Sequence, residues 1–355
     1  MKITGCEIWP ITLTLEEPFT IAYSTMDHAI NYILRIDTDA GISGFGCSAF
    51  DEEVTGENEH TIDRALHEIA SPMLLGEDPL AYRDVLSRVH AQLADQPTAL
   101  AAVDMALFDI LGKQVGLPVY RLLGGSRTAM LSSITIGIRP ITEVLEKAKQ
   151  WTRRGYKALK IKGGVSFEED TEKLYRLRET IGQDIQIYFD ANQGYTREEA
   201  LAIMQVLTHV GAKFIEQPCH KKDLSAFSSL SEFSGKCIPV MADEAVLGPE
   251  DVHQVIAAGG ADMFNIKLAK TGGILRALEL DAVARSYGSR TMVGCMDEAG
   301  LGIAAALHVA LACPNVQYAD LDGHVEFIED PSYDAVKIVN GYVIPHDQPG
   351  LGFTF

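Results

Sequence analysis

The chain has 355 residues, of which 47% are hydrophobic and 22% charged, so it can bury a large core and exceeds a single small domain. Its 30 basic and 49 acidic residues give a formal charge of -19, which disfavours nucleic acid and anionic membrane surfaces as partners. No apolar run reaches the roughly 18 residues of a membrane helix, and Met1–Leu15 lacks a basic leader, so we expect a cytoplasmic protein.

The amino-terminal part predicts an α+β unit over residues 1–125. Apolar and polar residues alternate in Lys2–Leu15 and Asn31–Asp37, as in half-buried strands, and helical periodicity follows in His60–Ile69 and Ala99–Val115. Strands followed by helices are typical of an α+β domain rather than of a parallel α/β sheet.

From Leu131 onward, short apolar segments alternate with amphipathic helices, which is the pattern of parallel βαβ units. The predicted strands are Ser132–Ile138, Ala158–Lys162, Ile185–Asp190, Lys213–Gln217, Ile238–Glu244, Met263–Lys267, Thr291–Cys295 and Val316–Asp322. Eight strand-helix repeats predict a closed (β/α)₈ barrel over residues 126–324. The tail, residues 325–355, contains Pro331, Pro345 and Pro349 and is predicted to pack back on the amino-terminal domain, completing it as a cap.

The six cysteines do not suggest a disulfide framework or a zinc site. They lie far apart in the sequence and form no CxxC pair: Cys6, Cys47, Cys219, Cys237, Cys295 and Cys313. We expect reduced thiols.

One polar residue recurs at the end of each predicted strand from the second to the eighth, and the spacings lie between 24 and 28 residues. These residues are Lys162, Asp190, Glu216, Asp243, Lys267, Cys295 and Asp320. The active site of a (β/α)₈ barrel lies at the carboxyl ends of its strands, so we expect these side chains to meet at the barrel mouth. Polar residues also occur at strand ends because strands end in solvent, which is the simpler alternative.

Asp190, Glu216 and Asp243 end three consecutive strands, so their carboxylates are expected to converge on one patch. Unpaired carboxylates repel one another, and a divalent cation removes the repulsion. An all-oxygen ligand set without His or Cys favours Mg²⁺. The alternative is that one or more of these acids caps a helix or forms a salt bridge.

Lys162 and Lys267 end the second and sixth strands, half a barrel apart, so the two amines are expected to face each other across the mouth. A substrate held between two bases can lose a proton from one face and regain it on the other, which is racemisation or epimerisation. Lys160 shares a strand face with Lys162, whereas Lys270 is expected to stand outside the site. Each lysine could instead be a solvated or salt-bridged residue.

Five motifs in order resemble the enolase superfamily, in its muconate-lactonising subgroup, over nearly the whole chain. They are KIKGG at Lys160–Gly164, DANQGY at Asp190–Tyr195, EQP from Glu216, ADE at Ala242–Glu244 and NIKLAKTGG at Asn265–Gly273. The resemblance implies a barrel roofed by an α+β cap whose loops select the substrate, with lysine and Mg²⁺ chemistry that is a known pattern of the superfamily.

Within that subgroup, Asp320-Leu321-Asp322 resembles the signature of dipeptide epimerases, whose paired acids hold the ammonium group of the substrate. Alternate residues of a strand share a face, so both carboxylates are expected to point inward. The resemblance further implies that Lys160 contacts the substrate carboxylate and that Thr135 lines the pocket. It also implies that Asn192 and Asn265 support the ligands. Both aspartates could alternatively be ordinary strand-end residues.

The mouth is expected to be acidic, because Cys295, Met296, Asp297 and Glu298 end the seventh strand and Asp51, Glu52 and Glu53 form a cap loop. We therefore expect Asp51, Cys295 and Asp297 to contact the substrate, and we expect a preference for dipeptides that contain Lys or Arg. Relatives that prefer Ala-Glu are expected to carry a cationic residue early in the cap, and Glu16–Met26 contains none. Surface acidity in a chain of charge -19 is the competing explanation.

The leading hypothesis is therefore a Mg²⁺-dependent epimerase that converts L,L-dipeptides into L,D-dipeptides. A muconate-lactonising or o-succinylbenzoate synthase-like activity on the same scaffold is the alternative, for which the aspartate pair would have no cationic partner. A peptide-binding protein with a remnant metal site is a third possibility, and the complete set of lysines and carboxylates argues against it. The sequence leaves a homo-oligomer open.

Overall fold

The amino-terminal strands form an antiparallel sheet in the computed structural model, which describes residues 1–234 and 238–355, without the Ser234 side chain. Strands β1 (Ile3–Thr20), β2 (Thr25–Thr38) and β3 (Ser43–Ala49) pair in the order β1-β2-β3. Strands β1 and β2 are longer than predicted, because they stay paired out to Phe19 with Met26 and Thr20 with Thr25, where the sequence no longer alternates. Strand β3 was not predicted, because Gly44 and Gly46 weaken the strand signal even though Phe45, Cys47 and Ala49 alternate.

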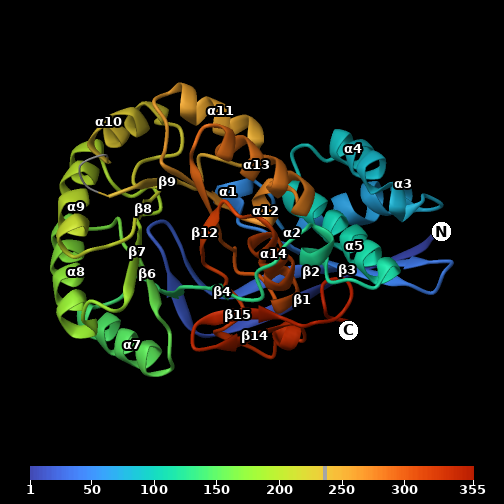
Figure 1. The fold of residues 1–355 in the computed structure, drawn as a ribbon, viewed down its shortest axis with the longest axis horizontal. Helices are drawn as coiled ribbons and strands as arrows, with labels where there is room; N and C mark the ends of the chain where they lie inside the picture. The colour runs from blue at the N-terminus through green and yellow to red at the C-terminus, as the bar shows by residue number, and fades with distance from the viewer. Residues whose placement is uncertain (235–237) are drawn as a thin grey trace.

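The helices of the same domain lie against one face of this sheet (Figure 1). They are α1 (Glu52–Thr55), α2 (Glu59–Arg64), the π-helix η1 (Ala65–Ala70), α3 (Ser71–Leu74), the 3₁₀ turn η2 (Pro79–Ala81), α4 (Tyr82–Gln92), α5 (Pro97–Val115) and α6 (Val119–Leu122). The predicted helix His60–Ile69 therefore continues as a π-helix. Helix α5 is apolar nearly all round because it is buried between the sheet and the barrel.

The second half of the chain forms the predicted eight-stranded parallel sheet. Its strands are β5 (Ile134–Ile136), β6 (Ala158–Lys162), β7 (Gln186–Asp190), β8 (Ile215–Glu216), β9 (Val240–Ala242), β10 (Met263–Ile266), β11 (Arg290–Val293) and β12 (Val316–Ala319). The connecting helices are α7 (Ile141–Arg153), α8 (Phe167–Ile181), α9 (Arg197–His209), α10 (Leu224–Ser234), α11 (Pro249–Ala257), α12 (Leu268–Thr271), α13 (Ile274–Ser286) and α14 (Gly300–Ala312). Figure 1 shows the helices curving around the strands.

The sheet curls so that its first and last strands meet. A parallel bridge joins Ser132 to Ala319, and the Ser133 N–H donates to the Ala319 carbonyl at 3.0 Å. The predicted barrel beside an α+β cap is confirmed, except that in the described residues no α-helix follows the eighth strand. Apolar side chains fill one part of the interior: Ala158, Tyr188, Phe214, Met241, Met263 and Met292. The barrel is therefore a packed core and not a channel.

The carboxyl-terminal tail divides between the two parts of the protein. Strand β13 (Phe327–Ile328) pairs with β1 in the cap sheet, and β14 (Val336–Val339) and β15 (Tyr342–Pro345) form a hairpin that pairs with β4 (Met130–Leu131). A 3₁₀ turn, η3, precedes the hairpin at Tyr333–Ala335. The last residues return to the cap, where the Phe355 ring contacts Trp9. The boundaries at residues 125 and 325 stay a prediction.

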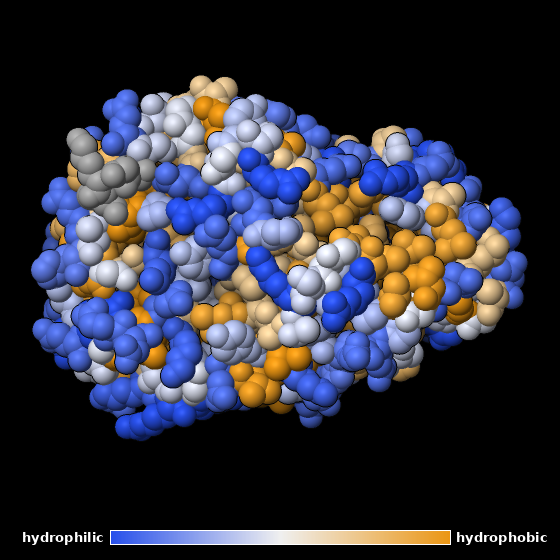
Figure 2. Space-filling model, in the orientation of Figure 1, coloured by the Kyte–Doolittle hydropathy of each residue, from blue (hydrophilic) through white to orange (hydrophobic). Residues whose placement is uncertain are grey.

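The outer helices of the barrel show a hydrophilic surface in Figure 2, as expected for amphipathic helices that turn their apolar faces to the strands. In the described part of the chain, no helix is both long and apolar enough to span a membrane. The cysteines Cys6, Cys47, Cys219, Cys295 and Cys313 are free thiols, and Cys237 lies outside the described residues.

The contact between β3 and α5 leaves no room for a side chain at Gly46, because an added Cβ would lie 1.9 Å from the Ala102 carbonyl oxygen. We expect Gly46→Ala to destabilise the protein by about 1–3 kcal/mol or more, as overpacking of a core does. Gly5→Ala in β1 is the control, since an added Cβ there meets nothing within 4 Å. Thermal denaturation of both variants measures the effect, and equal melting temperatures would contradict this packing.

Candidate active site at the barrel mouth

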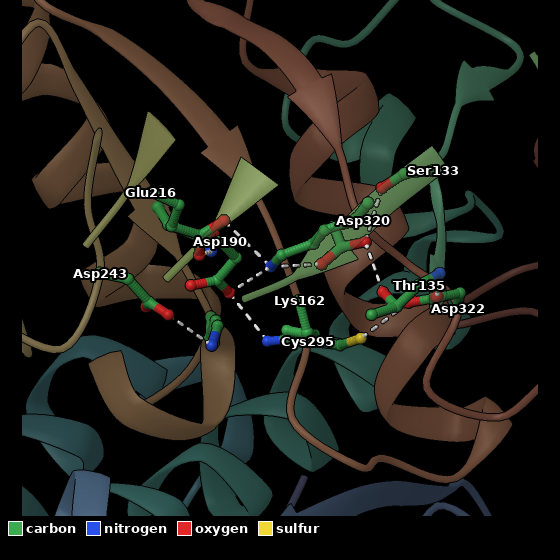
Figure 3. A network of polar contacts seen from close by, with 12 residues as sticks. Ser133, Thr135, Lys162, Asp190, Glu216, Asp243, Cys295, Asp320 and Asp322 are labelled. Atoms are coloured by element: carbon green, nitrogen blue, oxygen red, sulfur yellow. Dashed lines mark hydrogen bonds and ion pairs between the residues drawn. The ribbon is translucent and has the colours of Figure 1, made fainter. Parts of the chain in front are cut away.

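The strand ends bring the predicted charged residues together at one end of the barrel. Lys162, Asp190 and Glu216 are the last residues of β6, β7 and β8, and they are direct register partners across the three strands. Asp243 and Lys267 immediately follow β9 and β10. All five side chains are buried. The parallel register therefore places a row of charges side by side, as Figure 3 shows for the labelled members.

The ammonium group of Lys160 lies among the carboxylates. Its Nζ is 3.1 Å from Asp190 Oδ2, 3.0 Å from Glu216 Oε2 and 2.8 Å from Asp320 Oδ2. Lys162 contacts Asp190 Oδ2 as well, at 2.8 Å. A single cation thus touches acids from β7, β8 and the end of β12, which requires those carboxylates to converge.

The third predicted ligand, Asp243, is held by two lysines. Lys267 Nζ is 2.7 Å from its Oδ2, and Lys270 Nζ is 2.6 Å from its Oδ1. Lys270 is not among the residues that line the substrate cavity, but it is fully buried and also donates to the Asp243 carbonyl, so it supports this predicted ligand. One turn of α12 separates Lys267 from Lys270, and this i,i+3 spacing was the available sequence signal.

Amide side chains support the carboxylates. Asn265 Nδ2 donates to Glu216 Oε1 at 2.7 Å, and the Asn192 backbone N–H donates to Asp190 Oδ1 at 2.9 Å. Asn192 Nδ2 also donates to Glu244 at 3.1 Å, a buried acid that the sequence argument did not use. Asn265 therefore supports Glu216 from outside the cavity, whereas Asn192 contacts Asp190 and also lines the cavity.

Burial and mutual repulsion control the ionisation of these groups. Burial raises the pKa of Glu216 to about 8, and Asp190 adds to the rise while Lys160 opposes it. Burial acts in the same direction on Asp190, but Lys162 and Lys160 outweigh it and hold the pKa of Asp190 below its usual value. Burial would lower the pKa of Lys267, and the Asp243 carboxylate outweighs that effect and raises it. The cluster stabilises positive charge.

The donor set of the cluster suits a hard divalent cation. Asp190, Glu216 and Asp243 offer only oxygen, and the buried Glu216 Oε2 has the Lys160 ammonium at 3.0 Å as an ion-pair partner without a hydrogen bond from the described residues. The ammonium group of Lys160 lies between Asp190 and Glu216, within 3.1 Å of both. A positive charge is therefore already present between these two carboxylates. Among the described residues no three His, Cys, Asp or Glu side chains stand together as a ready metal site, and lysines contact the oxygens instead. The three carboxylates therefore offer the oxygen ligands that Mg²⁺ prefers, and Asp190 and Glu216 converge on one position.

A cavity between the cap and the barrel opens onto this cluster. Its barrel wall includes Ile134, Thr135, Lys160, Lys162, Asn192, Lys267, Cys295, Met296, Asp297, Asp320 and Asp322, and its cap wall includes Leu15, Phe19, Ile21, Tyr23, Met26, Asp51 and Val54. Lys162 and Lys267 line the same cavity from β6 and β10, which are four positions apart in the eight-stranded order.

The side of the cavity opposite the acidic row carries Asp320 and Asp322 (Figure 3). Ser133 Oγ donates to Asp320 Oδ1 at 2.6 Å, and the Thr135 backbone N–H donates to Asp322. Burial and the Asp320 charge raise the pKa of Asp322 to about 7. Within the part of the chain that the structure describes, Asp322 forms no ion pair, whereas Asp320 pairs with Lys160. Ser133 was missed, since a serine at a strand start carries no distinctive pattern.

Two further acids face the cavity from different domains. Asp51 caps α1 by accepting from the Glu53 N–H at 2.9 Å, and it also accepts from Tyr23 Oη at 3.0 Å. The Asp297 carboxylate has no hydrogen bond or ion pair within the described part of the chain. Burial raises the pKa of Asp297 to about 6, with Lys162 opposing the rise and Asp51 adding to it. The cap and the barrel together form an anionic subsite.

Two family profiles match the chain. Residues 4–124 match the mandelate racemase / muconate lactonizing enzyme N-terminal domain, and residues 143–355 match the enolase C-terminal domain-like family. The chain belongs to the enolase superfamily, in its mandelate racemase and muconate lactonizing group. The resemblance found in the sequence motifs is therefore confirmed.

The chain is similar over its full length to characterised members of this superfamily. It is 39% identical to an L-Lys-D/L-Arg epimerase of Desulforapulum autotrophicum, over 99% of both chains. The dipeptide epimerase of Methylococcus capsulatus, solved with Mg and L-Arg-D-Lys, is 33% identical over 100% of both chains with a TM-score of 0.95. The substrate-liganded L-Ala-D/L-Glu epimerase of Bacillus subtilis is 32% identical, with a TM-score of 0.95 over 99% of this chain and 98% of that one. The expectation of an epimerase or racemase of the enolase superfamily is confirmed.

Proposed function

We propose that this protein is a Mg²⁺-dependent dipeptide epimerase that inverts the α-carbon of the C-terminal residue, from L,L to L,D. The observation that carries the proposal is the placement of Lys162 and Lys267 on opposite sides of one cavity, half the barrel apart. The acidic row lies between them in sequence order, on β7, β8 and β9. The solved relatives with bound dipeptides support the same substrate class.

The two lysines divide the proton transfer. One neutral amine removes the α-proton from one face of the substrate, and the ammonium group on the other side returns a proton to the opposite face. Both side chains are buried beneath the cap, so water competes poorly for either proton. A two-base arrangement of this kind inverts a stereocentre without any net redox change.

Asp190, Glu216 and Asp243 would hold the Mg²⁺ ion. When bound, the ion would neutralise these carboxylates and act as a Lewis acid on the substrate carboxylate, where negative charge accumulates. A positioned general base typically accelerates a reaction about 10²- to 10⁴-fold. A modest enzymatic acceleration of ~10⁶-fold requires the activation barrier to fall by about 8 kcal/mol, so the base alone does not account for it. Electrostatic stabilisation must therefore supply the remainder.

Asp320 and Asp322 would bind the terminal ammonium group of the dipeptide. Asp322 has no cationic partner in the described residues and lines the cavity, so a substrate ammonium would supply the missing charge. The same two acids would repel the dicarboxylate substrates of muconate-lactonising or o-succinylbenzoate synthase-like enzymes. This pair favours the epimerase over those alternatives.

Asp297 and Asp51 would select a dipeptide with a Lys or Arg side chain. The Asp297 carboxylate lines the cavity and has no ion-pair partner among the described residues. An acid that served only to make the surface soluble would face the solvent instead. The cavity-lining part of the cap contributes Phe19, Ile21, Tyr23 and Met26 but no basic residue. The 39%-identical relative acts on Lys and Arg, which agrees with this preference.

We expect Lys162→Ala and Lys267→Ala each to lower epimerisation by at least about 10³-fold, because each removes one of the two bases. Each variant should still exchange the α-proton of one epimer with deuterated buffer, since the remaining lysine reaches one face. Mass spectrometry of L,L and L,D dipeptides incubated separately measures the exchange. Two variants that epimerise at the wild-type rate would refute the two-base mechanism.

We expect Mg²⁺ to raise the melting temperature, because an ion that binds only the folded state at 100 times its dissociation constant adds about 2.7 kcal/mol. Glu216→Gln should remove most of this shift, and EDTA should abolish it in the wild type. Glu198→Gln, an exposed acid on α9, is the matched control. Equal shifts in Glu216→Gln and wild type would exclude the acidic row as the metal site.

We expect Asp297→Asn to lower kcat/KM for L-Ala-L-Lys by about 10- to 100-fold, the effect of one charged hydrogen bond, and to spare L-Ala-L-Ala. Glu53→Gln, at an exposed position of α1, is the control for overall acidity. Steady-state kinetics on Ala-Lys, Ala-Ala and Ala-Glu distinguish recognition of a cationic side chain from a general effect of acidity. Faster turnover of Ala-Glu than of Ala-Lys would rule out the cationic preference.

The preference itself should depend on pH. Because the pKa of Asp297 is about 6, the carboxylate is charged above that pH and neutral below it. The ratio of kcat/KM for Ala-Lys to that for Ala-Ala should therefore fall as the pH drops from 8 to 5. Taking the ratio cancels the titration of groups that both substrates share. A ratio that stays constant across this range would remove Asp297 from the recognition of the side chain.

A further inference from the structure

A buried network lies directly behind Lys162. Asp170, in the first turn of α8, accepts from Lys173 Nζ at 2.6 Å through Oδ1, and from Tyr195 Oη at 2.5 Å through Oδ2. Lys173 Nζ also donates to the Lys162 carbonyl at 3.3 Å. Asp170, Lys173 and Tyr195 are at most 5% exposed, and none of them lines the substrate cavity.

The network holds the turn that follows Lys162. The Gly164 N–H donates to Asp170 Oδ2 at 2.8 Å, and the Gly163 N–H donates to the Asp190 carbonyl at 2.9 Å. Gly164 has a φ of +93°, and a Cβ there would lie 2.1 Å from the Ala191 carbonyl oxygen. The backbone immediately after Lys162 is thus wedged against the loop after β7 and tied to Asp170.

Lys267 has a different support. Its carbonyl accepts from the N–H groups of Lys270 and Thr271 at 3.1 and 3.0 Å and from Thr271 Oγ1 at 3.0 Å, because Lys267 is the N-cap residue of α12. A regular helical turn therefore fixes this lysine. Lys162 itself ends β6 and pairs with Asp190 of β7, whereas its carbonyl and the turn after it are held by side chains of α8, which Tyr195 from the loop after β7 braces.

We propose that Asp170, with Tyr195 and Lys173, is a positioning device for Lys162 alone and sets the rate of proton transfer on one face of the substrate. This inference rests on the proposed two-base function. The three residues act through the backbone of Lys162 and touch neither the substrate nor the row of acids that would bind the metal. Burial raises the pKa of the Tyr195 hydroxyl, and Asp170 adds to the rise, so Tyr195 stays a hydrogen-bond donor.

Variants of Asp170 or Tyr195 are expected to slow proton transfer on the face of the substrate that Lys162 serves. They are not expected to weaken substrate binding. A displacement of a catalytic group by about 1 Å costs on the order of 10²-fold, and loss of one supporting hydrogen bond permits a smaller shift. Residues that merely stabilise the fold would slow both faces equally. The asymmetry between the two faces therefore distinguishes positioning from general stability.

The test measures deuterium wash-in separately from the two epimers of the best substrate among Ala-Lys, Ala-Glu and Ala-Ala. Lys162→Ala first identifies the epimer that Lys162 serves, as the one whose exchange is lost. Tyr195→Phe should then slow exchange of that epimer about tenfold, change the other less than about twofold, and leave KM unchanged. Asp170→Asn should act on the same epimer more strongly.

Tyr188→Phe is the matched control, because Tyr188 is another buried tyrosine whose hydroxyl bonds Gln186 away from the mouth. It should leave both exchange rates unchanged. Equal slowing of both epimers by Tyr195→Phe, no slowing, or slowing of the epimer served by Lys267 would each overturn the inference. Absence of exchange in the wild type with all three dipeptides would instead refute the proposed function.

Discussion

Charge compensation at the barrel mouth is the constraint on which the rest of the structure depends. Asp190, Glu216, Asp243 and Asp320 are buried within one cluster, where their mutual repulsion is weakly screened. Ammonium groups from β6 and from the segment after β10 offset that repulsion, and each acid has at least one of them within 3.1 Å. Replacing any one charge leaves an uncompensated partner, so this end of the barrel favours positive charge.

The packed interior of the barrel makes that arrangement rigid. The register of β6, β7 and β8 puts Lys162, Asp190 and Glu216 at the same level, and aromatic and methionine side chains fill the space beneath. The backbone, not side-chain flexibility, therefore sets the separation of the charges. The cap contributes a further acid to the mouth, because Asp51, the N-cap residue of α1, lines the same cavity.

The two proposed bases, Lys162 and Lys267, are supported in unequal ways, although the proposed chemistry treats them as equivalent. A helical turn holds the Lys267 carbonyl, and the Asp170 network holds the turn after Lys162. Such an arrangement lets the rates on the two faces of the substrate be adjusted separately. The proposed substrate preference depends on a different part of the site, because the Asp297 carboxylate lies on the loop after β11. In the described residues it contacts neither the turn after Lys267 nor the Asp170 network.

The sequence by itself determined the barrel, the cap and the acidic row, because strand and helix periodicity and the polar residue after each strand are local patterns. It did not indicate β3, whose two glycines weaken the strand signal, or the π-helix after Arg64. Only the tertiary structure brought Lys270 to Asp243, Ser133 to Asp320 and Tyr195 to Asp170. Apart from the i,i+3 spacing of Lys267 and Lys270, these pairs depend on the curvature of the sheet, on side-chain direction and on where the cap and the outer helices meet the strands. No local pattern contains that information.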